Sequence, residues 1–187
     1  MFSRVLSAIV FTLGFGFLVQ GLYIPAKAVL AQHLIQRAWV KTIKTGDLTL
    51  PWAWMDAHPV ARLTLPNQKS YIVLNEDSGQ ALAFGPALVS GTSIEGNSMT
   101  AIAAHKNTQF TSLKTIKIGD VISLQTIRNE TVSYQVSHQA VIDTRRETLL
   151  DQGENTLALI TCYPFNAVSF NGPLRYVVYA EKLPRRV

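Results

Sequence analysis

The chain has 187 residues, of which 48% are hydrophobic, so it can form one domain with a sizeable core and a smaller appendage. Its formal net charge of +5 permits anionic partners, but the basic residues are scattered and form no arginine run or aromatic RNA-binding motif, which argues against nucleic-acid binding. A basic surface is equally suited to anionic phospholipid or cell-wall polymer. The single cysteine excludes an internal disulfide in any compartment.

The N-terminal segment from Val5 to Ile24 contains no charged residue. About twenty apolar residues are enough for a helix that crosses a hydrocarbon layer ~30 Å thick. A cleaved signal peptide is the alternative, because Ala26-Lys27-Ala28 resembles a small-x-small cleavage site. The apolar run exceeds the roughly 7–15 residues usual in a signal peptide, so we predict an uncleaved transmembrane anchor over residues 1–25.

Residues 26–50 are predicted to form an amphipathic juxtamembrane helix and a linker. Apolar residues recur at helical spacing between Ala26 and Thr45, and Gly46 is expected to end the helix. The segment Pro51-Trp-Ala-Trp54 would either anchor at a bilayer interface or cap one end of the domain. More basic residues follow the apolar span than precede it, so the positive-inside rule by itself places the C-terminal part in the cytoplasm.

The remaining residues, 51–187, contain β-prone runs separated by frequent turn signals. Nothing repeats at a fixed period and strands do not alternate with helices, so a closed or nearly closed β-barrel with short helices fits best. Short helical or irregular pieces are expected at Gln80–Val89 and Phe110–Ile116. Strands are expected near Ala61–Leu65, Tyr71–Leu74, Thr100–His105, Val121–Thr126, Thr131–Ile142, Thr156–Cys162 and Arg175–Glu181.

Three chemically useful side chains lie at the edges of these predicted strands. Cys162 and His105 each end a strand, and Arg175 begins the last one. A thiol becomes an effective nucleophile when a nearby base or cation promotes the thiolate, and histidine supplies one. Arginine supplies fixed positive charge and several donors for a developing oxyanion. A lone cysteine is otherwise most often a small buried hydrophobe, so the hypothesis requires the three residues to meet in space.

These residues make the chain resemble the sortases, cysteine transpeptidases that recognise a C-terminal sorting signal. The family's Thr-Leu-x-Thr-Cys pattern is met as Ala158-Leu-Ile-Thr161-Cys162, its Gly-His-Arg segment as Ala104-His105-Lys106, and Arg175 opens the last strand. The resemblance extends from about Pro51 to Leu183 and implies an eight-stranded barrel for the catalytic domain.

Within the sortases, the chain looks most like the Gram-negative group called class GN or marine proteobacterial. The segments that carry this likeness are Pro51-Trp-Ala-Trp54, Pro59-Val-Ala-Arg-Leu63 and Ala81-Leu-Ala-Phe-Gly-Pro86. The chain departs from the family pattern in three places around the histidine: Ala104 replaces a usual Gly, Lys106 a usual Arg, and Asn107 a frequent Asp. The exchange of Arg for Lys keeps the charge but loses the planar fork of donors.

The resemblance implies a mechanism in which the thiolate of Cys162 attacks a threonine carbonyl of the sorting signal and forms a thioacyl intermediate. His105 protonates the departing amine and then accepts a proton from the incoming one. Arg175 holds substrate carbonyls and offsets the charge of the tetrahedral intermediate. The segments 143–155 and 163–173 are expected to bind the signal. The candidate substrate-binding residues are Thr161, Ala104, Leu149, Leu150 and Phe165.

The implied partners are a target protein with a Leu-Pro-x-Thr-Gly-like C-terminal signal, an amine acceptor and the membrane. Because the resemblance implies an enzyme that acts on exported proteins, we expect a single-pass inner-membrane protein with its catalytic domain on the periplasmic side. This expectation is opposite to the orientation that the positive-inside rule predicts. No cofactor is expected, and no metal site, because histidines, cysteine and carboxylates are not clustered at ligand spacing. The acidic pair Glu76-Asp77 and Glu95 are expected to be solvated and not to bind calcium.

Two other functions are open. The first is a cysteine protease of the same catalytic residues that releases the target protein to water. The second is a membrane-tethered binding module that keeps the fold and lacks catalysis. A cell-wall Cys/His peptidase is less consistent with the sequence, because such enzymes present their His and Cys close together along the chain.

Overall fold

The computed structural model describes residues 2–95, 98–146, 149, 151–167 and 172–184. Its elements are, in chain order, α1 (Phe2–Thr45), β1 (Pro59–Thr64), β2 (Ser70–Leu74), α2 (Gly79–Phe84), β3 (Ala87–Leu88), β4 (Thr100–Ala103), the 3₁₀ helix η1 (Thr111–Thr115), β5 (Val121–Thr126), β6 (Thr131–Asp143), β7 (Thr156–Cys162) and β8 (Leu174–Lys182).

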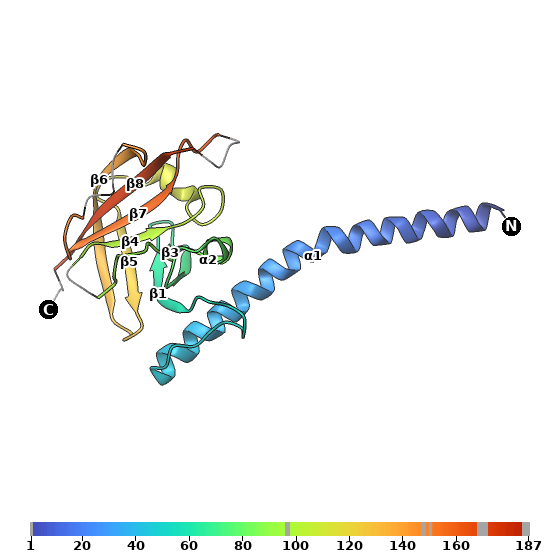
Figure 1. Cartoon of the computed structure of the whole chain (residues 1–187), viewed down its shortest axis with the longest axis horizontal. Helices are drawn as coiled ribbons and strands as arrows, with labels where there is room; N and C mark the ends of the chain where they lie inside the picture. Colours follow the sequence, from blue (N-terminus) through green and yellow to red (C-terminus); the bar gives the residue numbers. More distant parts are fainter. Residues whose placement is uncertain (1, 96–97, 147–148, 150, 168–171, 185–187) are drawn as a thin grey trace.

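The strands close into one barrel in the order β1-β2-β3-β4-β7-β8-β6-β5, as Figure 1 shows. This confirms the predicted closed barrel. Strands β4 and β7 run parallel, so their C-terminal ends reach the same rim. Antiparallel β8 begins at that rim, because it pairs with β7 along its whole length. The topology therefore brings two strand ends and one strand start together.

Most strands were predicted within a residue or two, and β5 and β7 have the predicted bounds. The prediction was incomplete at Gln80–Val89, which was expected to be helical or irregular throughout. The segment does contain α2, but it also contains β3, the two-residue strand that joins β2 to β4. A strand this short shows no period of two, so the sequence pattern carries no signal for it.

The barrel interior is filled by side chains from strands all round the wall, including Leu63, Ile102, Leu124 and Leu159, each with at most 1% of its surface exposed. Phe110, which follows β4, is also fully buried there. Because side chains alternate across a strand, every second residue points into this core and the residues between point outward. The residues of β7 that point into the core therefore determine which of its other residues point outward.

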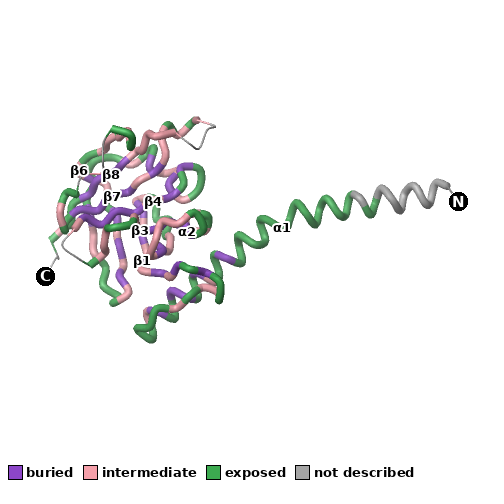
Figure 2. The backbone as a smooth tube through the Cα atoms, viewed as in Figure 1, coloured by how far each residue is buried: buried purple, intermediate pink, exposed green. Residues whose placement is uncertain are grey.

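Helix α1 runs without interruption through Pro25, and its two halves have different surroundings. Ile35, Ala38 and Trp39 are buried against the side of the barrel, whereas the N-terminal half extends away from it (Figures 1 and 2). The helix ends where Gly46, with φ of +77°, donates its N–H to the Thr42 carbonyl at 2.8 Å, so the predicted stop at Gly46 is confirmed.

The two tryptophans of the Pro51–Trp54 segment differ. Trp52 is half-buried where α1 meets the barrel, and its ring makes a T-shaped contact with Phe84 at 5.1 Å between centroids. Trp54 has 76% of its surface exposed. Trp52 therefore takes the predicted role of a cap on the domain, and the other predicted role, contact with a bilayer interface, stays a prediction.

Candidate functional site

The parallel pairing of β4 with β7 aligns His105 with Cys162. The paired positions run from Thr100↔Leu157 to Ala103↔Ile160, and the Ala104 N–H donates to the Ile160 carbonyl at 3.1 Å. The same register continued for two residues places His105 beside Cys162. Neighbouring strands are ~4.8 Å apart, so the two side chains start within reach of each other.

Arg175 lies on the other side of the cysteine. It is the register partner of Cys162 in the β7–β8 pair. Residues two and four positions before Cys162 and after Arg175, together with those four and six positions before His105, belong to one apolar cluster on the outside of the barrel. We call this the outer cluster; its buried members are Met99, Ala101, Ala158, Val177 and Tyr179, and Ala140, Ile142, Ile160, Leu149 and Val89 pack around them. Alternation therefore directs all three reactive side chains to the outer face, where this cluster ends.

His105 is exposed, and Cys162 and Arg175 are half-buried, so the three residues are accessible at the rim. The main chain after the histidine turns back sharply, since the His105 carbonyl accepts the N–H of Phe110 at 3.1 Å. Phe110 is fully buried in the barrel core. The backbone that carries the imidazole is therefore attached to the rigid interior, while the imidazole itself faces solvent.

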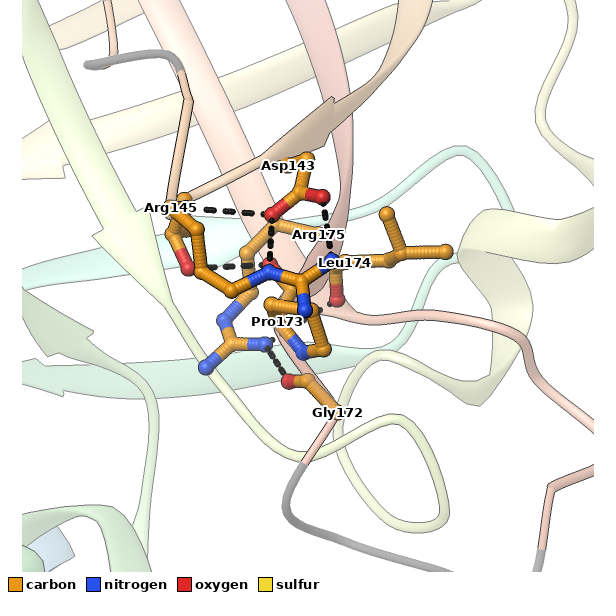
Figure 3. A network of polar contacts seen from close by, with 7 residues as sticks. Asp143, Arg145, Gly172, Pro173, Leu174 and Arg175 are labelled. Carbon is orange, nitrogen blue, oxygen red and sulfur yellow. Dashed lines mark hydrogen bonds and ion pairs between the residues drawn. The ribbon is translucent and has the colours of Figure 1, made fainter.

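Figure 3 shows how the Arg175 guanidinium is held. Its Nη1 donates to the carbonyl of Gly172 at 2.6 Å and to that of Leu174 at 3.0 Å. On the neighbouring β6 end, Asp143 forms a two-point ion pair with Arg145, with Nη2 2.7 Å from Oδ2. The hydrogen bond from the Arg145 side chain is the main cause that lowers the pKa of Asp143. An ion pair therefore lies at the end of β6 that pairs with the start of β8, next to Arg175.

Two of the predicted substrate-binding residues, Thr161 and Ala104, are buried side by side beneath the rim. The Thr161 hydroxyl donates to the Ala104 carbonyl at 2.7 Å, and their exposed fractions are 2% and 6%. Both alternate with the catalytic candidates and so face inward. They connect β7 to β4 directly beneath Cys162 and His105.

The other predicted substrate-binding residues lie on the loops. Leu149 packs against the outer cluster, and Leu150 lies outside the described residues. Phe165 is half-buried and meets the Tyr176 ring at 5.2 Å between centroids, over the end of the barrel core. The loop after Cys162 therefore closes the barrel end with aromatic side chains.

Asp151 is a residue that the sequence reasoning missed. Its Oδ1 accepts the N–H of Met99 at 2.9 Å and that of Gly153 at 2.8 Å, which attaches the loop between β6 and β7 to the start of β4. These bonds, the one from Gly153 first, lower the pKa of Asp151. The Asp-x-Gly spacing is typical of a carboxylate that accepts a hydrogen bond within its own turn, so the local bond could be predicted from the sequence. The bond to Met99 joins residues far apart along the chain, and no local sequence pattern indicates it.

Within the described ranges, no group of three or more histidine, cysteine or carboxylate side chains could hold a metal ion. A cavity at the opposite end of the barrel is lined by residues such as Thr131, Asn155 and Lys182. Because Asn155 precedes β7 and Cys162 ends it, that cavity is separated from the three reactive side chains by the length of the barrel.

The comparisons with known proteins agree on one family. The model of the sortase domain matches residues 63–183. Sortase C1 from Streptococcus suis is 25% identical, with a TM-score of 0.58 over 68% of this chain and 74% of that chain. The pilus-related sortase C of Group B Streptococcus is 28% identical, with a TM-score of 0.56 over 67% and 68% of the two chains. Sortase C-1 from Streptococcus pneumoniae is 27% identical, with a TM-score of 0.58 over 67% of each chain. Comparison with curated proteins gives no match.

Proposed function

Because this chain belongs to the sortase family, we propose that it is a membrane-anchored cysteine transpeptidase that cuts the C-terminal sorting signal of an exported protein and joins that protein to an amine. One observation carries the proposal: the register of β4, β7 and β8 brings His105, Cys162 and Arg175 side by side at one accessible rim. A nucleophile, an acid–base group and a fixed cation are the parts that acyl transfer requires.

In the proposed reaction, the Cys162 sulfur attacks the carbonyl carbon of a threonine in the signal and forms a C–S bond. As the tetrahedral intermediate collapses, the C–N bond breaks and His105 gives its proton to the departing amine. The acceptor amine then attacks the thioester, His105 takes up its proton, and Cys162 leaves as thiolate. Arg175 offsets the oxyanion charge in both steps; Nη1 takes the main-chain contacts, so Nε and Nη2 would meet the substrate.

We assign the outer cluster as the surface that receives the apolar part of a Leu-Pro-x-Thr-Gly-like signal. It begins immediately next to Cys162 and is partly covered by Leu149 from the loop between β6 and β7. Phe165 would border the signal on the other side of the thiol. Thr161 and Ala104 support the site from below, since their hydroxyl–carbonyl bond joins the two strands that carry Cys162 and His105.

The membrane anchor is proposed from helix α1. The segment Gly14–Thr45 is long and apolar enough to cross a membrane, and large apolar side chains such as Phe15, Phe17 and Leu22 are exposed on it. We propose residues 1–25 as the anchor, 26–50 as the juxtamembrane helix and linker, and 51–187 as the catalytic domain. The domain would lie on the periplasmic side of the inner membrane, and a reporter fused to the C terminus tests this orientation.

The Gram-negative subgroup, class GN, belongs to the same proposal. It is supported by the Pro51–Trp54, Pro59–Leu63 and Ala81–Pro86 segments, of which the first and last pack together through Trp52 and Phe84. A neighbouring gene whose product ends in a sorting motif, an apolar span and basic residues would give the target protein and sharpen the assignment.

The test of function is a reaction with sorting-signal peptides in the presence and absence of amine acceptors. We expect a peptide–amine conjugate that depends on the acceptor and is absent with Cys162→Ala. If the peptide is only hydrolysed, whatever amine is supplied, transpeptidation is refuted and the cysteine-protease alternative is supported. Peptide binding with no cleavage by the wild-type protein would leave the binding module.

A further inference from the structure

Lys106, the residue after the candidate acid–base histidine, is a buried cation. Only 4% of its surface is exposed. It lies in the turn that follows β4, and its side chain reaches the loop that follows Cys162. Burial of an ammonium group costs free energy unless its N–H groups find acceptors. The acceptors that Lys106 binds therefore indicate its role.

The Lys106 ammonium binds the loop that follows the cysteine. Its Nζ donates to the Pro164 carbonyl at 2.8 Å and to the Ala167 carbonyl at 2.8 Å. The Ala167 N–H also donates to the Pro164 carbonyl at 3.3 Å, so these two residues close a turn around the lysine. A charged donor makes stronger hydrogen bonds than a neutral one, which makes Lys106 a strong constraint on this turn.

The constrained turn begins two residues after Cys162. Tyr163 connects them and is itself attached to β8 through its N–H, which donates to the Leu174 carbonyl at 3.0 Å. Lys106 therefore joins the chain segment that carries the histidine to the loop that borders the thiol. Removal of its ammonium would leave two carbonyl groups of that loop without their charged donor.

We infer that Lys106 is a positioning residue: it holds the Tyr163–Ala167 loop as one wall of the site, so that a bound peptide presents its carbonyl to Cys162. This rests on the proposed function. Lys106 acts through the loop, not on the sulfur, so its loss affects reactions that need an aligned peptide and spares reactions of the thiol with small reagents. A misplacement of about 1 Å in such a wall costs on the order of 10²-fold in rate.

The experiment compares full-length wild-type protein with Lys106→Met, which keeps the length of the side chain and removes the donors. We expect thioacylation by an internally quenched Leu-Pro-x-Thr-Gly-type peptide to fall on the order of 10²-fold. Alkylation of Cys162 by iodoacetamide should stay within about 2-fold of wild type, because it needs no peptide alignment. Lys106→Arg should recover part of the peptide reaction, since it restores charged donors. Lys114→Met, which removes an exposed lysine from η1, is the matched control and should change neither rate.

Hydrogen exchange gives a readout that does not depend on activity. The amides of Tyr163 and Ala167 should exchange faster in Lys106→Met than in wild type. If the Lys106→Met variant does not fold, the same comparison is made with Lys106→Gln. An unchanged peptide rate, or an equal loss of peptide and iodoacetamide reactivity, would overturn the inference. A wild-type protein that forms no thioacyl adduct would overturn the proposed function instead, and the exchange comparison would still decide whether Lys106 orders the loop.

Discussion

The two faces of β7 perform different tasks with alternate residues of one strand. Leu157, Leu159 and Thr161 face the barrel interior, where the two leucines are fully buried. Ala158, Ile160 and Cys162 face outward, from the outer cluster to the reactive rim. If the proposed function holds, residues that stabilise the barrel and residues that serve the reaction alternate along β7, because the period of two assigns each position to one face. Each face should therefore be changeable with limited effect on the other.

The largest effect is expected from Cys162→Ala on the outer face. Loss of the nucleophile should lower peptide cleavage by more than about 10³-fold, because the remaining groups bind and polarise the substrate without forming the thioester. The free energy of unfolding should change by less than about 1 kcal/mol, since the thiol is not part of the core. Peptide kinetics and urea unfolding measure the two quantities. Retained cleavage would place the chemistry elsewhere.

The inner face is tested by Leu159→Ala. This side chain is fully buried, so its truncation should lower the free energy of unfolding by about 2–5 kcal/mol. The value of kcat/KM per folded molecule should remain within about 3-fold of wild type, because the outward residues keep their positions. Urea unfolding together with active-site titration checks both. A large fall in kcat/KM with no change in the free energy of unfolding would contradict the assignment of the inner face to stability alone.

Truncation of Ile160, the next residue along β7, should affect peptide binding more than stability, the opposite of Leu159→Ala. Ile160 lies on the outer face, half-buried against the outer cluster. Ile160→Ala should raise KM for an apolar sorting peptide by about 10-fold, the usual cost of removing methylene groups from a peptide-binding surface. Its cost in stability should be smaller than that of Leu159→Ala. An unchanged KM would show that the signal binds on another surface.

The smallest effect concerns pH and the loop between β6 and β7. Hydrogen bonds from Gly153 and Met99 lower the pKa of Asp151 from its ordinary value of 3.8. A lowered folded-state pKa stabilises the protein fully above 3.8, and the contribution is lost as the pH falls through the lowered value. The protection of the Met99 amide, taken as its exchange rate relative to the intrinsic rate at the same pH, should therefore fall in acid in the wild-type protein. Asp151→Asn keeps an acceptor without the charge, so it should flatten this dependence; an equal acid response in both proteins would contradict the assignment.

Much of the barrel could be predicted, because its strands show a period of two and end at turn residues. Thr156–Cys162 illustrates this: an apolar β-prone run between a polar turn and Tyr163-Pro164 gives both bounds. The candidates His105, Cys162 and Arg175 could also be named from their places at strand edges together with the family resemblance. Their meeting at one rim depends on the parallel register of β4 with β7, a long-range property that no local pattern contains.

Other features required the folded chain for the same reason. The two-residue β3 has no periodic signal, and the contact of Lys106 with Pro164 spans more than fifty residues. Thr161 could be read either as a substrate contact or as an ordinary strand residue. Its bond to Ala104 becomes visible only when the two strands are side by side.

The central claim is that Cys162 attacks a peptide carbonyl with the help of His105. Mass spectrometry of the protein after incubation with a sorting-signal peptide tests it most directly. We predict a mass increase equal to the N-terminal cleavage fragment less one water, mapped to the peptide that contains Cys162, released by an added amine and greatly reduced in His105→Ala. An unmodified Cys162 in a protein that still cleaves the peptide, or an adduct on another residue, would contradict the account.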